Sequence, residues 1–297
     1  MLYFHCGTLQ EVDLNLSSKA VPWKTYQYQI SSFWRYYRAA KTRYDVHSPF
    51  LSVWVETVLE DQRQFYAFDD AEIIRNHWMH NLQMVDYSTD HGAGSRAGQG
   101  KKRSVQEIVQ KSAIEAYAGR WLFRMVNFHK PKTILELGTS LGISALYLQG
   151  GRRSARLITF EGNPTVAKLA KESFRKSRRR VPDIRVGTFV EEIPKIVKAF
   201  KKLDFIWIDG DHKYESTVLY FEQLLPLLHE RSVVVIGDIY WSKEMELAWL
   251  EIRRHERVSM SVDLYKMGVL FFRQELQQQE HHVLIPQRFK PWRLGFF

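Results

Sequence analysis

The sequence predicts an α/β fold: a doubly wound sheet of seven strands that closes with an antiparallel hairpin and is preceded by a helical cap. From residue 104 onward, short apolar segments alternate in series with helical segments. Such alternation is typical of a parallel sheet with helices on both faces. Near the end, two apolar segments are separated by only a short turn. A short turn joins antiparallel strands, because parallel neighbours need a long crossover.

The composition favours a globular protein of a reducing compartment. The 297 residues are 45% hydrophobic, enough to bury the core of one large or two small domains. The single cysteine, Cys6, rules out an internal disulfide framework. The N-terminal stretch does not resemble a signal peptide, and no apolar run approaches the ~20 residues that span a bilayer. We therefore expect a soluble, cytoplasmic protein with no membrane partner.

Residues 1–85 are predicted to form the helical cap. Trp, Tyr and Phe recur there at spacings of three and four residues, which indicates helices around an aromatic core. In the segment YDVHSPF, Ser48 before Pro49 can begin a helix. His47 beside it is more often structural than functional. The residues at helical spacing are Phe33, Trp34, Tyr37, Phe50, Val53, Trp54 and Val58.

Residues 86–103 are rich in Gly and Ser and are predicted to form a loop. Its segment DHGAGS, residues 90–95, superficially resembles a ligand-binding glycine turn. No strand ending in an acid follows at the right distance, however. The segment either arches over a ligand or is a plain connector.

The region 104–273 supplies the sheet and its helices in order. Apolar segments bounded by turn residues predict the strands, and apolar residues at helical spacing predict the helices. The tail, 274–297, begins polar and ends aromatic, so it could dock on the body or pair with a second copy. Strands are expected at 133–137, 157–160, 184–186, 205–208, 233–236, 258–264 and 268–272, and helices at 105–128, from 140, 164–178, from 191, 215–228 and 242–255.

A glycine-rich turn follows the first strand, in ILELGTSLGIS. Gly138 and Gly142 stand where the strand passes into a helix, so the backbone can approach a ligand closely. Glu161 closes the next strand, where an acid can accept hydrogen bonds from ribose hydroxyls. The turn lacks the G-x-G-x-x-G fingerprint of dinucleotide sites. A nicotinamide-dependent dehydrogenase is therefore the least favoured enzyme.

A second polar cluster follows in FIWIDGDHKYES. Asp209 and Asp238 end strands that we expect to be neighbours ~4.8 Å apart, so their carboxylates would meet. Two such acids repel, which raises one pKa unless a cation or a histidine lies between them. A divalent ion with oxygen ligands is one solution. Alternatively, Asp211 and His212 are only a capped helix start.

The order of these motifs resembles the class I S-adenosylmethionine-dependent methyltransferases. The resemblance rests on Glu136, the two glycines, Glu161 and the closing hairpin, and it covers about residues 104–273. It implies a Rossmann-like fold with S-adenosylmethionine as cofactor. The N-terminal extension with VHSPF resembles poorly characterised bacterial methyltransferases. The resemblance also implies cofactor contacts from Glu136, Gly138, Thr139, Ser140, Gly142, Ser144, Glu161, Thr188, Phe189 and Asp209.

Several of these residues have an implied place along the cofactor. Glu136 would lie near the amino group of the methionine moiety, and Ser144 would hold its carboxylate. Gly187, Thr188 and Phe189 would line the adenine.

Within that group, Asp209, His212 and Asp238 look most like the catechol-type and sugar O-methyltransferases. The likeness implies that Asp209 and Asp238 bind magnesium and that His212 takes the proton of the substrate hydroxyl. Ile239 departs from the pattern, since metal-dependent members offer Asn or an acid there. A ligand is then missing, which weighs against a metal. Tyr240 and Trp241 either line a substrate pocket or only pack against neighbouring side chains.

The leading hypothesis is an enzyme that methylates a hydroxyl of a small molecule. One alternative is a nucleic acid or protein acceptor, supported by the net charge of +10 and the basic run at 168–185. That run is otherwise a solvated helix face. Another alternative is a non-catalytic module that binds S-adenosylmethionine or a nucleotide. The cap and the tail could each support a homodimer.

Overall fold

The computed structural model describes residues 23–87, 102–276 and 278–291. Cys6, the predicted glycine segment at 90–95 and the last six residues of the tail lie outside the described residues. Among the described residues, no helix is both long and apolar enough to cross a membrane.

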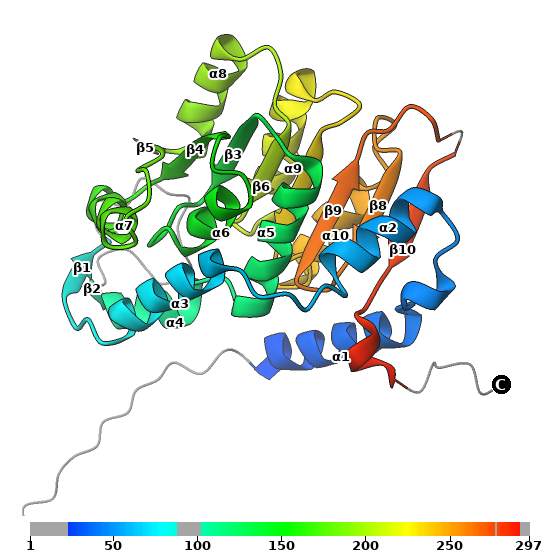
Figure 1. Ribbon diagram of the computed structural model, residues 1–297, viewed down its shortest axis with the longest axis horizontal. Helices are drawn as coiled ribbons and strands as arrows, with labels where there is room; N and C mark the ends of the chain where they lie inside the picture. The colour runs from blue at the N-terminus through cyan, green and yellow to red at the C-terminus, as the bar shows by residue number, and fades with distance from the viewer. Residues whose placement is uncertain (1–22, 88–101, 277, 292–297) are drawn as a thin grey trace, which may run out of the picture.

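A mixed sheet of eight strands forms the centre of the molecule, in the order β10-β8-β9-β7-β6-β3-β4-β5 (Figure 1). Strands β3 to β7 are parallel, and β9 runs antiparallel to both β7 and β8. The strands are β3 (Thr133–Leu137), β4 (Arg156–Glu161), β5 (Asp183–Val186), β6 (Phe205–Ile208), β7 (Val233–Gly237), β8 (Met260–Asp263), β9 (Met267–Phe271) and β10 (Glu280–Val283).

The predicted α/β class and the terminal hairpin are confirmed, but the predicted count of seven strands is wrong. The extra strand, β10, lies in the tail and pairs parallel with β8 at the edge of the sheet. Its sequence, Glu-His-His-Val, is polar and short, so no alternation or apolar run marked it.

Helices cover both faces of the sheet, as the alternation predicted. Side chains of α5, α6 and α7 share one core with Ile134 of β3, whereas α8, α9 and α10 pack against Leu135 and Leu137. Successive residues of β3 thus serve opposite faces. The helices are α4 (Val105–Ser112), α5 (Ala116–His129), α6 (Ile143–Gly151), α7 (Pro164–Lys176), α8 (Phe189–Ala199), α9 (Tyr214–Leu224) and α10 (Lys243–Ile252), with a 3-10 turn η2 (Leu225–Leu227).

Two helix predictions need correction. The helix expected at 105–128 is broken into α4 and α5, because Ala113 is extended with a ψ of 130°. Arg75 donates to the carbonyl of Ile114 in this break. The helix expected from Ser140 begins at Ile143, because Ser140 and Gly142 have φ angles of 47° and 80°. Left-handed residues cannot belong to a right-handed helix.

The N-terminal helices divide into two groups. Trp54 of α2 and Trp78 of α3 are buried in the same core as α5 and α6. Helix α1 lies apart from them, below the sheet in Figure 1, and Trp34 on it is 56% exposed. Ser48 and Pro49 begin a helix as predicted. The remaining elements are α1 (Trp23–Ala39), η1 (Arg43–Asp45), α2 (Pro49–Val58), α3 (Tyr66–Met79), η3 (Gln287–Phe289) and the antiparallel pair β1 (Met84–Asp86) and β2 (Lys102–Ser104).

Candidate active site

The glycine turn after β3 passes directly under the end of β6. A Cβ atom on Gly138 would lie 2.3 Å from the carbonyl oxygen of Asp209, and its φ is 103°. Only glycine fits both the space and the backbone angle. The amide of Thr139 donates to the carbonyl of Phe160 at 2.9 Å, which ties the turn to β4. The turn therefore brings the ends of three neighbouring strands together.

Glu161 ends β4 beside this turn, as predicted. One carboxylate oxygen accepts from the amide of Ser140 at 2.8 Å, and the other accepts from the amide of Asn163 at 2.9 Å. The side chain of Asn163 in turn caps α7. The carboxylate is thus held at the carboxyl end of the sheet, which we call the catalytic edge: the ends of β3, β4, β6 and β7 with the residues that follow them.

Glu136 and Ser144 lie close together beneath the turn. Ser144 donates to one oxygen of the fully buried Glu136 at 2.7 Å, and Thr159 donates to the other at 2.6 Å. Burial raises the pKa of Glu136 to about 7, although both hydroxyl bonds lower it and Glu161 raises it. Both residues were predicted to contact the methionine moiety. In the structure they bind each other.

On the far side of the turn, Thr188 and Phe189 begin α8. Thr188 caps this helix by accepting from the amide of Glu191 at 3.2 Å. The ring of Phe189 lies across Gly210, where a Cβ atom would come within 2.7 Å of it. It also meets the ring of Tyr220 edge-on at 5.4 Å. Phe189, which follows β5, therefore reaches the loop that follows β6.

Asp209, His212 and Asp238 form a cluster at the ends of β6 and β7. The two strands are neighbours, as predicted. Nε2 of His212 lies 4.0 Å from a carboxylate oxygen of Asp209 and 3.9 Å from one of Asp238. Burial raises the pKa of Asp209 to about 7; His212 lowers it, and Asp238 and Glu136 raise it further. The histidine thus lies between two acids that would otherwise repel.

Asp211 does not cap the helix start, contrary to the alternative reading of the sequence. Lys213 occupies the N-cap position of α9 and makes no side-chain cap bond. The carboxylate of Asp211 instead accepts from the hydroxyl of Tyr220 at 3.2 Å and pairs with Lys213 at 3.4 Å. Its φ of 58° turns the chain sharply just before His212. Asp211 therefore shapes the loop that carries the histidine.

The residues after Asp238 differ in their surroundings. Ile239 is fully buried in the core, so it offers nothing to the cluster. Tyr240 donates to the buried Asp263 at 2.8 Å and stacks on Tyr265 at 5.1 Å, which is packing. The ring of Trp241 is 42% exposed and lies 6.3 Å from that of His212.

A third group of residues beside Asp238 has no signature in the sequence. Lys266 from the β8–β9 turn pairs with Glu115 at the start of α5, at 2.9 Å. Burial lowers the pKa of Lys266, but the bond to Glu115 outweighs it and the net shift is upward, to which Asp238 adds. Tyr117 also interacts with Glu115 and with Asp238. These residues come from distant segments without any motif, so only the fold brings them together.

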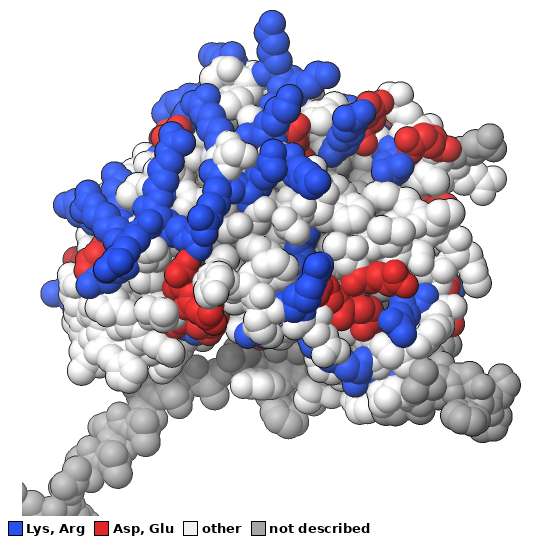
Figure 2. All heavy atoms as spheres, in the orientation of Figure 1, with Lys and Arg blue, Asp and Glu red and all other residues white. Residues whose placement is uncertain are grey.

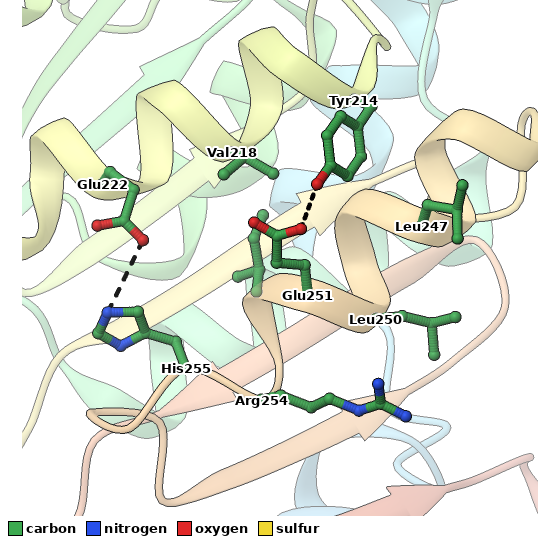
Figure 3. Close-up of a pocket in the computed structure, with 9 residues that line it drawn as sticks. Tyr214, Val218, Glu222, Leu247, Leu250, Glu251, Arg254 and His255 are labelled. Atoms are coloured by element: carbon green, nitrogen blue, oxygen red, sulfur yellow. Dashed lines mark hydrogen bonds and ion pairs between the residues drawn. The ribbon is translucent and has the colours of Figure 1, made fainter.

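Two grooves in the described part of the chain lie away from the cluster. A groove of about 590 Å³ runs between α9 and α10, where Tyr214 contacts Glu251 and Glu222 pairs with His255 (Figure 3). No residue of the catalytic edge lines it. The groove therefore does not share the chemistry of the cluster.

Comparison with known proteins agrees with this arrangement. Residues 135–239 match a family described as a methyltransferase domain. The chain is 28% identical over 158 residues to the O-methyltransferase hkm8 of Aspergillus hancockii, covering 51% of this chain and 60% of that protein. It is 26% identical over 134 residues to a catechol O-methyltransferase of Mycobacterium tuberculosis, covering 44% and 59%. The chain thus spans about 60% of the length of these curated relatives.

Solved structures share the fold. The O-methyltransferase TomG of Streptomyces achromogenes, solved with SAM, aligns with a TM-score of 0.51 at 14% identity, covering 75% of this chain and 96% of that one. The O-methyltransferase of Bacillus cereus, solved with SAH, aligns at 0.50 with 17% identity, covering 75% and 97%. The resemblance to class I methyltransferases that the sequence indicated is confirmed.

Proposed function

Because residues 135–239 match a methyltransferase domain and the chain has the class I methyltransferase fold, we propose that this protein moves a methyl group from S-adenosylmethionine to a hydroxyl of a small molecule. The observation that carries the proposal is the shared edge: the glycine turn, Glu161 and the Asp209–His212–Asp238 cluster all lie at the ends of neighbouring strands.

The residues at this edge fit the cofactor. Gly138 leaves room where a side chain would collide with β6, and Glu161 presents a fixed carboxylate suited to ribose hydroxyls. Phe189 offers a ring face at the place expected for the adenine. Acids gathered at the edge favour a cationic ligand, and the bound cofactor supplies a methyl group on a positively charged sulfur.

We assign His212 as the proton acceptor for the substrate hydroxyl. A neutral imidazole suits this role near pH 7. Asp209 and Asp238, about 4 Å from Nε2 on two sides, stabilise the imidazolium that forms. Trp241 beside it and the Glu115–Lys266 pair border the acceptor. Alignment and exclusion of water then supply most of the rate.

A divalent cation is the alternative occupant of the same three groups. One ligand atom from each of Asp209, His212 and Asp238 lies within 4.8 Å of the others. A cation held there would make a substrate hydroxyl more acidic. It would also bind the nitrogen of His212 that we assign as the base, so the two roles exclude each other.

A small acceptor is favoured over a nucleic acid. The catalytic edge is rich in acids, which repel a polyanion. Three segments with many exposed basic residues, 152–156, 175–180 and 198–202, precede strands and so lie at the other edge of the sheet. A protein acceptor stays an alternative outcome of an acceptor screen.

Calorimetric titration with S-adenosylhomocysteine, with and without magnesium, tests the cofactor. We expect binding that Glu161→Ala weakens at least tenfold, while Glu172→Ala in helix α7 leaves it unchanged. If magnesium strengthens the binding of S-adenosylhomocysteine and Asp238→Asn abolishes this effect, a divalent cation bound by Asp209, His212 and Asp238 is favoured.

The outcomes separate the hypotheses. Absence of binding by the folded protein would overturn the methyltransferase proposal. Binding of the cofactor without turnover on a panel of hydroxyl acceptors would favour a non-catalytic cofactor-binding module.

A further inference from the structure

A strongly basic surface lies at the edge of the sheet opposite the active site. It consists of three segments, 152–156, 175–180 and 198–202, which we call the basic edge. Together they hold ten exposed Lys and Arg residues and no acid. Figure 2 shows these side chains gathered over the part of the molecule where α7 and α8 lie.

The three segments form one continuous surface although they are separate in the sequence. Each connects the end of a helix to the start of the next strand, β4, β5 or β6. Gln149 at the end of α6 donates to the carbonyl of Arg180 at 2.7 Å. The guanidinium of Arg156 lies 4.7 Å from the ring centre of Phe200. The second contact joins the first segment to the third, and the first contact holds the end of α6, just before the first segment, against the second segment.

Helix stabilisation does not account for this charge. A cation in the last turn of a helix interacts favourably with the free carbonyls. Arg178 and Arg180, however, lie beyond Lys176, the last residue of α7. In the described part of the chain, neither side chain has an acidic partner within 4.0 Å. Their charge is therefore available to a partner.

The basic edge is remote from the reacting groups. Arg156 and Glu161 are the first and last residues of β4, and five steps of ~3.3 Å place them ~16 Å apart. A rigid duplex that lies along the basic edge is therefore held away from His212.

We propose that the basic edge binds the phosphate backbone of double-stranded nucleic acid, which is an anchoring partner and not the methyl acceptor. The starts of β5, β4, β3 and β6 follow one another at ~4.8 Å, so the edge extends ~14 Å. That length spans about four phosphates of one strand at ~3.4 Å each. The planar guanidinium group of an arginine can donate two parallel hydrogen bonds to the oxygens of one phosphate.

Two other anionic partners fit less well. Stable attachment to a lipid surface needs apolar insertion besides charge, yet no large hydrophobic side chain in the three segments is exposed. Single-stranded nucleic acid is held by stacking on aromatic rings. The one aromatic residue here is Phe200, half-buried and covered by Arg156.

The test is fluorescence anisotropy with random 20-base-pair DNA and RNA duplexes over a range of salt concentrations. We expect binding whose logarithm falls against the logarithm of salt with a slope of about −4, from about four phosphates. The triple variant R175E/R178E/R180E should lose more than tenfold in affinity and flatten the slope by roughly three. The control R38E/K41E/R43E makes the same charge change on exposed residues of α1, η1 and the link between them.

Thermal unfolding monitored by circular dichroism establishes that each variant is folded. Equal losses of affinity for the duplex in both triple variants would show that binding depends only on net charge, which would overturn the proposal. So would binding to phosphatidylglycerol vesicles but not to duplexes. Transfer of a labelled methyl group to the bound duplex would contradict its role as anchor only. None of these outcomes depends on the small-molecule activity.

Discussion

His212 owes its position to two neighbouring strands and one tight turn. Asp209 and Asp238 follow β6 and β7 directly, so the pairing of those strands brings the carboxylates together. The left-handed backbone at Asp211 then returns the chain, so that the imidazole lies between them. Sequence reasoning could place the two acids, because each follows a recognisable strand. It could not place the ring, which depends on a backbone angle that no motif encodes.

Replacement of His212 should lower turnover far more than cofactor affinity. A positioned base contributes about 10²–10⁴ in rate, so we expect His212→Ala to lower kcat about a hundredfold with little change in binding of S-adenosylhomocysteine. Activity of the unmodified protein should rise with pH as Asp209, whose pKa is raised to about 7, ionises beside the imidazole. The variant should lose this rise.

The matched control for this experiment is His255→Ala. His255 also pairs with a carboxylate, that of Glu222, but lies in the α9–α10 groove. Equal losses in both variants would indicate general destabilisation and contradict the assignment of His212.

Glu136 should make the protein less stable as pH rises. Burial raises its pKa to about 7 in the folded chain from an ordinary value of 4.5, so the folded state holds the proton more tightly. Its stabilising contribution is complete below about pH 4.5 and is lost as pH rises to about 7. The ionisation of this one group costs on the order of 3 kcal/mol.

Urea unfolding at pH 5 and pH 8 checks this prediction. The Glu136→Gln variant cannot ionise at this position. Its free energy of unfolding, relative to that of the unmodified protein, should therefore be higher at pH 8 than at pH 5. The hydroxyl of Ser144 can turn to accept from the new amide. If the variant and the unmodified protein differ in free energy of unfolding by the same amount at both pH values, the pKa of Glu136 is not raised.

At the scale of elements, Glu246 of α10 is one attachment of helix α1 beside the catalytic edge. That carboxylate accepts from the hydroxyl of Tyr28 at 2.6 Å and from the guanidinium of Arg35 at 2.8 and 2.9 Å. Gln29 also donates to the carbonyl of Trp241, next to the proposed acceptor site. The helix therefore borders the place where a substrate would enter.

Removal of this attachment should loosen α1 without unfolding the sheet. Glu246→Ala removes three such bonds, which contribute about 1 kcal/mol each, so it should speed amide hydrogen exchange in α1 roughly a hundredfold. Exchange in β3 and β6 should not change. Glu244→Ala, an exposed acid on the same helix, is the control. If both variants behave alike, Glu246 is not the attachment.

The elements differ in how far the sequence could predict them. Buried strands such as β6 and β7 were found because four consecutive branched or aromatic residues leave few alternatives. The break between α4 and α5 was missed because Ala113, Ile114 and Glu115 show no helix-breaking residue. It is a consequence of tertiary packing, in which α4 lies against α3 and α5 against α6.

At the scale of the whole molecule, charge is divided between two edges of one sheet. The net charge of +10 was evident from composition, and the basic run at 168–185 from the sequence. The sequence did not reveal that these charges form one surface. The segments 152–156 and 198–202 lie beside the basic run only because the strands of the sheet align. The division favours a small acceptor at the acidic edge and a polyanion at the basic one.

The two ends of the described chain are also joined at one side of the sheet. The hydroxyl of Tyr36 on α1 donates to the carbonyl of Leu284 at 2.5 Å, and Nζ of Lys290 donates to the carbonyls of Tyr37 and Ala40 at 2.6 and 2.8 Å. A chain that ends at residue 279 would lose β10 and all three bonds.

We expect that truncation to expose β8 as a new edge strand and to release α1. Exposed edges pair with other chains, so size-exclusion chromatography should show association, and hydrogen exchange should show rapid exchange in α1. Binding of S-adenosylhomocysteine should persist, because β3, β4 and β6 are far from β10 in the strand order. Lys290→Met, which removes only two bonds, should give a smaller effect. A monomeric truncated chain with a protected α1 would contradict this prediction.

The hydrogen bond between Tyr36 and Leu284 can form only late in synthesis on the ribosome. The two residues are 248 positions apart, and a ribosome adds ~5–20 residues per second. Helix α1 therefore emerges ~10–50 s before the strand that covers Tyr36 exists. During that interval its aromatic inner face has no native partner, so a nascent chain of this protein is a natural client for chaperones until its last residues are made.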